Sequence, residues 1–148
     1  MPSILITGAN RGLGLEFARQ YAGEAWQVFA ACRNPDSAAQ LDELKRASGR
    51  QVTILTIDVS DLASVRAAAK HLEGTPIDVL VNNAGIAGPS NQTTGRVDYR
   101  AWAQVLDVNT MGPLRLIESF LNHLALSDRR MVVTITSGMA SLDRKSVV

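Results

Sequence analysis

The chain has 148 residues, of which 46% are hydrophobic, and its 15 Lys and Arg nearly balance its 14 Asp and Glu. This size and apolar content suit one compact domain with a buried core. The two charge signs alternate along the chain, which argues against nucleic acid or an anionic membrane surface as the main partner. The apolar stretches are too short for a membrane span or a signal peptide. The one cysteine, Cys32, can form neither an internal disulfide nor a cysteine-based metal cluster. We therefore expect a cytoplasmic protein without a metal site, in which Cys32 is a buried apolar side chain.

Short runs rich in Ile, Val and Leu alternate with longer segments that carry apolar residues at helical spacing. The expected strands are Ser3 to Thr7, Gln27 to Cys32, Val52 to Ile57, Val79 to Asn82 and Met131 to Thr136. The expected helices are Gly12 to Ala22, Asp36 to Ala47, Leu62 to Leu72 and Tyr99 to Leu126. This alternation is typical of βαβ units, and strands that are apolar at consecutive positions indicate a parallel sheet covered on both faces. We expect an α/β fold with a Rossmann-type, doubly wound parallel sheet, and a functional loop from Ile86 to Val97.

Several helix ends carry recognisable signals. Asn34 followed by Pro35 is a favourable start for the second helix, because Asn can cap free N–H groups and Pro has none to satisfy. Ser60 or Asp61 can cap the third helix in the same way. Pro113 lies inside the fourth helical span, so we expect a bend or a boundary near Asn109 to Gly112.

A glycine-rich turn, Thr7-Gly8-Ala9-Asn10-Arg11-Gly12-Leu13-Gly14, lies between the first strand and the first helix. Glycine allows a tight turn, close approach of the backbone to a pyrophosphate and close packing of helix on strand, while free N–H groups at the helix start face the phosphates. The Lys and Ser/Thr of a Walker A loop are absent, which argues against a P-loop NTPase. The turn is also compatible with a purely structural role.

The end of the second strand is expected to face the adenosine ribose of a dinucleotide. An acidic residue there binds the 2′-hydroxyl of NAD, whereas arginine suits the 2′-phosphate of NADP. Arg33 stands at this place, and Arg11 in the glycine turn can reach the same group. Asp36 is the competing acid, but it follows Pro35 and fits better in the first turn of a helix. The sequence therefore favours NADP over NAD, with a solvated surface charge as the alternative role for Arg33.

With these motifs in place, the sequence resembles the short-chain dehydrogenase/reductase family across nearly its whole length, and within it the carbonyl-reductase branch that includes C-factor proteins. The pattern T-G-x-x-x-G-x-G falls on Thr7 to Gly14, an acidic residue after the third strand on Asp58, and N-N-A-G on Asn82 to Gly85. The resemblance implies cofactor contacts by Gly8, Asn10, Arg11, Gly12, Leu13, Gly14, Arg33, Asp58, Val59, Asn83, Ala84 and Gly85. It implies catalytic roles for Ser137, which orients the substrate oxygen, and for Asn109, which supports a proton relay.

Each polar position also has a physical interpretation of its own. Asn82 and Asn83 follow an apolar strand, where their amides can satisfy loop backbone groups. Asn109 is near the expected bend, where its amide and a freed carbonyl could hold a water. Ser137 follows a strand at the edge where open α/β sheets bind ligands. No nucleophile elbow surrounds it, and we expect both His71 and His123 on helix surfaces, so an α/β hydrolase is excluded.

The resembled family transfers hydride between a nicotinamide and a carbonyl or alcohol, with a tyrosine as proton donor and a lysine four residues later. The chain has only Tyr21 and Tyr99, followed at that distance by Ala25 and Ala103. We therefore expect residues 1–142 to be the NADP-binding part of a longer, homo-oligomeric reductase whose sheet is incomplete on the C-terminal side, and this fragment itself to be inactive. A non-catalytic NADP-binding or signalling protein of C-factor type is the alternative.

The last six residues, 143–148, look foreign to this fold. They can be encoded by the start of a widely used sequencing adapter, whose next codon is a stop. We expect them to be a non-native tail; a genuine C-terminus is the alternative.

Overall fold

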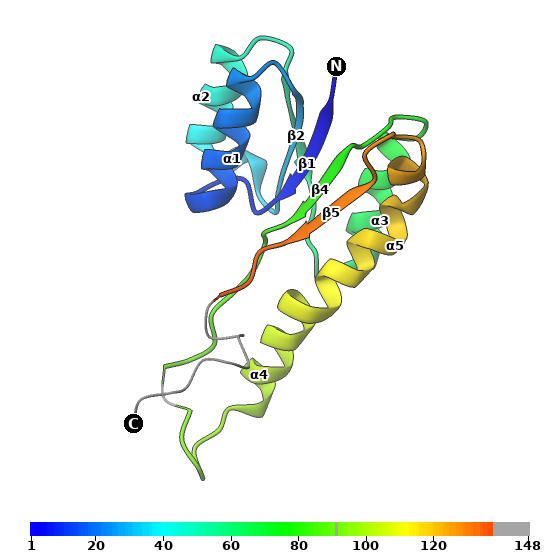
Figure 1. Cartoon of the computed structure of the whole chain (residues 1–148). Helices are drawn as coiled ribbons and strands as arrows, with labels where there is room; N and C mark the ends of the chain where they lie inside the picture. The colour runs from blue at the N-terminus through cyan, green and yellow to red at the C-terminus, as the bar shows by residue number, and fades with distance from the viewer. Residues whose placement is uncertain (91, 138–148) are drawn as a thin grey trace.

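The computed structural model describes residues 1–90 and 92–137, which form one parallel sheet with helices on both faces (Figure 1). The strands are β1 Ser3–Thr7, β2 Gln27–Cys32, β3 Val52–Thr56, β4 Val79–Asn82 and β5 Met131–Thr134. The helices are α1 Gly12–Gly23, α2 Ala39–Ala47, α3 Leu62–His71, α4 Tyr99–Leu106 and α5 Gly112–Ala125. The expected α/β fold is therefore confirmed, and the strand limits differ from those expected only at the ends of β3 and β5.

The sheet order is β3-β2-β1-β4-β5, with every neighbouring pair parallel. The strand β1 is central and buried along its whole length, because its apolar residues face helices on both sides. Ile4 lies opposite Val28 of β2 and Val79 of β4. The chain runs outward from β1 in one direction through β2 and β3, and then in the other through β4 and β5. This reversal is the place where open α/β sheets bind ligands, at the carboxyl ends of the strands.

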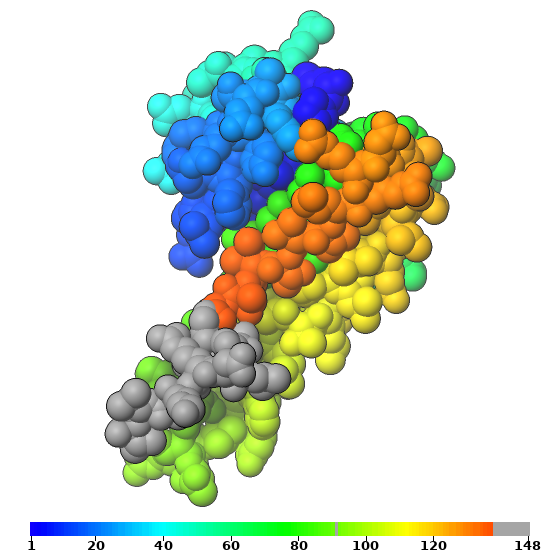
Figure 2. Space-filling view, in the orientation of Figure 1, coloured from blue at the N-terminus to red at the C-terminus, as the bar shows by residue number. Residues whose placement is uncertain are grey.

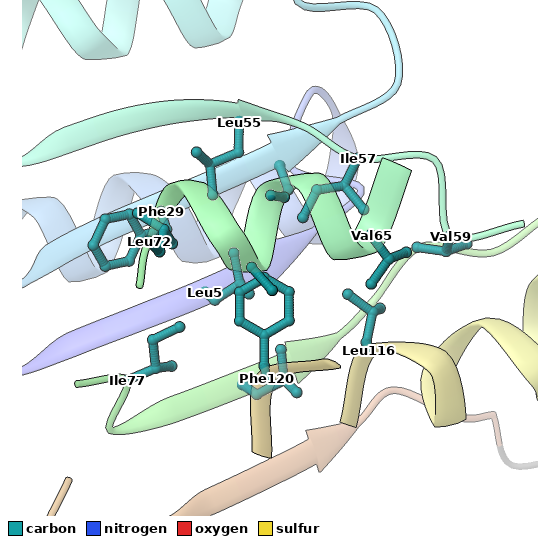
Figure 3. Packing of buried hydrophobic residues seen from close by; sticks show 14 of the residues in the cluster. Leu5, Phe29, Leu55, Ile57, Val59, Val65, Leu72, Ile77, Leu116 and Phe120 are labelled. Carbon is teal, nitrogen blue, oxygen red and sulfur yellow. The ribbon is translucent and has the colours of Figure 1, made fainter. Parts of the chain in front are cut away.

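Two hydrophobic layers hold the helices to the sheet. The helices α1 and α2 cover one face, and α3 and α5 cover the other (Figure 1). Figure 3 shows the second layer, in which Leu116 and Phe120 of α5 lie with Val65 of α3 against side chains of the sheet such as Leu5. Phe120 is fully buried, a degree of burial that stabilises the fold by roughly 1.5–3 kcal/mol for a side chain of this size. This packing holds α5 against β4, and it thereby also fixes the position of the segment Asp107–Met111 that precedes α5.

The expected bend in the fourth helical span is a π-helical turn, Asp107–Met111, between α4 and α5. Pro113 follows directly in the first turn of α5, where its missing N–H is tolerated. The turn and α4 extend beyond the carboxyl ends of the strands (Figure 1). Asn109, which is part of this turn, therefore lies near the carboxyl ends of β1 and β4, the edge of the sheet at which open α/β folds bind ligands.

The strand β5 forms an edge of the sheet, as the sequence predicted. Figure 2 shows this part of the chain on the surface, and Met131 and Val132 are 48% and 38% exposed. An exposed apolar edge strand is a template for pairing with further strands.

Three local expectations were wrong or only partly right. The second helix does not begin at Asp36: Pro35–Ser37 form a 3₁₀ turn, Asn34 makes no capping side-chain bond, and α2 starts after a break at Ala38. Ala38, at the break, is buried in the hydrophobic layer that α1 and α2 form on the sheet. His123 is buried, because its Nε2 lies 3.0 Å from the Ala69 carbonyl oxygen of α3.

Other expectations were confirmed. Asp61 caps α3 by accepting a hydrogen bond from the Ala63 N–H at 2.9 Å, His71 is exposed, and Cys32 is a buried free thiol. The 143–148 tail and the domain limit at residue 142 lie outside the described residues. Among the helices that are described, none is both long and apolar enough to cross a bilayer.

Candidate functional site

A cleft of about 410 Å³ opens at the carboxyl edge of the sheet, between the ends of β1, β2, β3 and β4. It is lined by Gly8, Asn10, Arg11, Gly12, Leu13, Cys32, Arg33, Asn34, Ser37, Ile57, Asp58, Val59, Asn83, Ala84, Gly85, Ile86 and Val108. Eleven residues expected from the sequence to contact a cofactor lie in this set, and Gly14 lies directly behind it. The residues that the sequence predicted as cofactor contacts come from four separate segments, and the fold brings them together in one cleft.

The glycine turn forms one wall, and two of its glycines are required by the backbone. Gly8 has φ +66°, and a Cβ there would lie 3.0 Å from the Ala84 Cα on β4's following segment. A Cβ on Gly14 would overlap the Gly8 carbonyl oxygen and lie 2.5 Å from Asn83 Nδ2. Neither position has room for a side chain, so the backbone of the turn and the start of α1 pack directly against the segment after β4. Its first N–H groups have no side-chain cap and begin at the cleft.

Thr7 and Asn83 lock this turn to the neighbouring strand. The Thr7 hydroxyl donates to the Val81 carbonyl oxygen at 3.3 Å and accepts from the N–H groups of Asn83 and Ala84, each at 3.1 Å. Asn83 Nδ2 donates back to the carbonyl oxygens of Thr7 and Gly8, at 3.0 and 3.2 Å. This confirms that the Asn83 amide satisfies loop backbone groups. Thr7, which the sequence placed in the motif but not in the site, is buried beneath it.

Asn82 has a different role from its neighbour. Its Nδ2 donates to Thr134 Oγ1 of β5 at 3.3 Å, and its buried Oδ1 has no hydrogen-bond partner among residues 1–90 and 92–137. It does not line the cleft, so it joins β4 to the edge strand.

Arg33 and Asp58 line the part of the cleft that follows β2 and β3. Burial alone would raise the pKa of Asp58, but hydrogen bonds from the Ser60 hydroxyl and N–H, at 2.6 and 2.9 Å, together with the Arg33 charge, lower that pKa below its ordinary value. The carboxylate of Asp58 is therefore ionised at neutral pH, and its negative charge partly balances the positive charge of Arg33 in the cleft. Ser37, whose hydroxyl donates to the Asn34 carbonyl oxygen at 3.0 Å, lines the same end.

Asn109 reaches the cleft through the loop after β4. Its Oδ1 accepts from the Ile86 N–H and its Nδ2 donates to the Ile86 carbonyl oxygen, both at 2.9 Å. A Cβ on Gly85 would lie 3.3 Å from the same Oδ1. Both polar atoms of the amide are thus engaged with the loop, and each keeps one further hydrogen-bonding position, so the water beside Asn109 stays a prediction. The π turn uses Asn109 to fix the loop that forms the cleft wall.

Ser137 lies three residues beyond the end of β5, at the same edge of the sheet, but it does not line the cleft. The structure therefore places Asn109 and Ser137 at one edge without bringing either into the cleft lining. Sequence reasoning missed several lining residues: Cys32, Asn34, Ser37, Ile57, Ile86 and Val108. Each is adjacent to an expected strand end or a motif, and that adjacency is the only sequence signal for them.

The fold and the glycine-lined cleft define an α/β protein with a dinucleotide-type phosphate site. Comparison with known proteins agrees: the sequence model of the short chain dehydrogenase family matches residues 2–147. A short-chain dehydrogenase, anuI, from Penicillium roqueforti is 36% identical over 149 residues, covering 95% of this chain and 58% of that protein. The chain belongs to the short-chain dehydrogenase/reductase family.

Solved structures lead to the same family. The crystal structure of a short-chain dehydrogenase/reductase from Burkholderia multivorans with bound NADP superposes with a TM-score of 0.86 at 28% identity, covering 98% of this chain and 63% of that one. A carbonyl reductase from Pseudomonas aeruginosa in complex with NADP gives 0.86 at 32% identity, covering 96% and 64%. The chain thus spans about three fifths of the length of these relatives.

Proposed function

We propose that this chain is the cofactor-binding part of an NADP(H)-dependent oxidoreductase. The observation that carries the proposal is the cleft itself. Its glycine turn has no room for a Cβ at Gly8 and Gly14, and two arginines line it, Arg11 in the turn and Arg33 after β2. The relatives from Burkholderia multivorans and Pseudomonas aeruginosa that carry NADP support the choice of cofactor.

Each part of NADP(H) has a matching group of residues in the cleft. The turn Gly8 to Gly14, including Asn10, Gly12 and Leu13, would hold the pyrophosphate at the start of α1. Arg33 and Arg11, with the Ser37 hydroxyl, would hold the 2′-phosphate, since guanidinium groups bind phosphate by charge-assisted hydrogen bonds. The groups after β3 and β4 follow along the sheet edge: Asp58 and Val59 beside the adenine, and Asn83, Ala84 and Gly85 beside the nicotinamide ribose. NAD, which has no 2′-phosphate, fits this set less well.

Bound NADP(H) supplies or accepts the hydride in this family's chemistry. In the whole protein we propose that Ser137 orients the carbonyl or alcohol oxygen and that Asn109 positions the loop beside the proton relay. The reacting tyrosine and its lysine are not among these 148 residues, because neither Tyr21 nor Tyr99 has a lysine four positions later. The reductases and dehydrogenases among the relatives support an enzyme over a non-catalytic C-factor-like protein.

Chemical-shift mapping tests the cofactor proposal. NADPH added to the isotope-labelled chain is expected to shift the amide signals of the glycine turn, the segment after β2 and the loop after β4. Signals at the amino ends of the strands, around the α2–β3 turn at residues 48–51 and the α3–β4 turn, are expected to stay in place and serve as the internal control. Shifts that avoid the cleft would contradict the proposed site, and the absence of shifts at millimolar NADPH would contradict the proposed function.

Activity tests the role of the longer protein. The present chain is expected to oxidise no NADPH with carbonyl substrates, because general acid catalysis, which contributes about 10²- to 10⁴-fold, has no tyrosine to supply it. Sequencing the source gene across codon 148 is expected to reveal a tyrosine with a lysine four residues later, and a chain extended that far is expected to turn over. A gene that contains no such pair would favour the non-catalytic alternative.

We further propose a homo-oligomeric whole protein that works in the cytoplasm. The elements α4, the π turn and α5 carry large apolar side chains that are each more than two fifths exposed: Tyr99, Trp102, Leu106, Met111, Leu114 and Leu121. Exposed apolar surface of this kind is typical of interfaces. The single buried thiol Cys32 agrees with a reducing compartment. Light scattering of the whole protein tests the first point, and a monomer at micromolar concentration would contradict it.

A further inference from the structure

Arg115 on α5 makes a set of contacts that the family motifs do not contain. Its Nη2 donates to Asp107 Oδ1 at 2.5 Å and lies 3.9 Å from Met111 Sδ. Its Nη1 donates to the Asp107 carbonyl oxygen at 3.3 Å and to the Val59 carbonyl oxygen at 3.2 Å. One guanidinium thus ties the start and end of the π turn to the segment that follows β3.

The Val59 segment is held against α5 from a second direction. A Cβ on Gly112, the first residue of α5, would lie 3.0 Å from Val59 Cγ2 and 3.3 Å from the Val59 carbonyl oxygen. The helix start and the segment after β3 are therefore in direct contact, and the carbonyl that Arg115 binds faces this contact. Val59 also lines the cleft, so its position sets one wall.

The same π turn also holds a second wall of the cleft, after β4. Asn109, in the middle of the turn, bonds the Ile86 N–H and carbonyl oxygen, and Ile86 lines the cleft after β4. A single five-residue turn therefore contacts both the wall after β3 and the wall after β4. Among the described residues, the Arg115 side chain donates hydrogen bonds both to the turn and to Val59.

We infer that Arg115 is a positioning residue, which sets the separation of the two cleft walls by holding the π turn against Val59. The inference rests on the proposed cofactor function for its binding consequence. Arg115 and Asp107 are 22% and 33% exposed at the side chain, and ion pairs with solvent access contribute little to global stability. Its loss is therefore expected to act on the cleft more than on the fold.

The test replaces Arg115 in the full 148-residue chain and measures cofactor binding. Arg115→Met keeps the aliphatic stem and removes the donors, and Arg115→Lys keeps the charge but reaches only one partner. Arg19→Met is the matched control, because Arg19 forms an exposed ion pair with Glu16 on α1, away from both walls. Arg115→Met is expected to raise the dissociation constants of NADPH and of adenosine 2′,5′-bisphosphate roughly tenfold, Arg115→Lys less, and Arg19→Met not at all.

Amide hydrogen exchange supplies a readout that needs no cofactor. In Arg115→Met, exchange is expected to accelerate in segments 58–60 and 86–88 and to stay unchanged in β1 and α1. Wild-type binding and exchange in this variant would overturn the inference, as would acceleration spread evenly over the chain, which indicates general destabilisation. If the wild-type chain binds no NADPH, the proposed function fails, and the local exchange pattern still decides the role of Arg115.

Discussion

Replacing Gly14 by alanine is the sharpest perturbation of the glycine turn. The added Cβ would overlap the Gly8 carbonyl oxygen and lie 2.5 Å from Asn83 Nδ2. Relief requires either the backbone of the turn to move or the Asn83 amide to leave. That amide donates to the carbonyl oxygens of Thr7 and Gly8, so both bonds are lost or lengthened together.

The magnitude follows from these terms. Forcing an extra methyl into a packed site costs about 1–3 kcal/mol, and two hydrogen bonds contribute about 0.5–1.5 kcal/mol each. Alanine returns about 1 kcal/mol through its higher helix propensity. The free energy of unfolding is therefore expected to fall by about 3 kcal/mol, and NADPH binding is expected to weaken strongly because the turn cannot keep its form.

Urea unfolding followed by circular dichroism measures the first effect, and an NADPH titration measures the second. Gly23→Ala is the matched control, because Gly23 lies in the same helix with no atom within 4 Å of an added Cβ. This control is expected to be more stable than wild type by about 0.5–1 kcal/mol. The reasoning is refuted if the Gly14 variant stays within about 0.5 kcal/mol of wild type and binds NADPH normally.

Three further results are expected. Arg33→Ala should weaken NADPH binding about 10- to 100-fold and leave NADH binding unchanged. The control Arg66→Ala, on the exposed face of α3, should change the binding of neither nucleotide. Equal losses for both nucleotides would contradict the proposed contact between Arg33 and the 2′-phosphate. Thr7→Val should cost about 2–4 kcal/mol in urea unfolding, because the hydroxyl loses three hydrogen bonds, two from the partly buried N–H groups of Asn83 and Ala84 and one to the Val81 carbonyl oxygen. A cost below about 1 kcal/mol would argue against this lock. Burial raises the pKa of the Cys32 thiol, so alkylation at pH 7.5 should be slower than for an unfolded control, and NADPH should slow it further; rapid labelling of the folded chain would contradict the burial.

The strands and the site's location were predictable from the sequence for a specific reason. Strands buried on both faces must be apolar at consecutive positions, and the runs at Ser3 to Thr7 and Val79 to Asn82 have this pattern. The glycine turn is equally constrained, since close backbone approach tolerates no other residue at Gly8 and Gly14. The apolar runs and the glycine spacing can be recognised in a single sequence, whereas the atoms that crowd Gly8 and Gly14 include Ala84 and Asn83 from a distant segment.

The remaining features depend on contacts between distant segments. The burial of His123 depends on the Ala69 carbonyl oxygen of another helix, and the surface of a helix does not reveal which neighbour covers it. The sequence indicated a bend before Pro113 but not its π-helical form, nor that Asn109 would use both amide atoms on Ile86. The Arg115 contact with Val59 spans 56 residues and follows from packing alone.

The central claim is that the cleft after β1 and β2 binds NADP(H). Isothermal titration of the purified chain with NADPH and NADH, at equal ionic strength, tests it most directly. The account predicts one binding site per chain and an affinity for NADPH at least about tenfold above that for NADH, from the phosphate contacts of Arg33 and Arg11. Equal affinity for the two nucleotides would contradict the assignment of these arginines, and no binding of either would contradict the cleft as a cofactor site.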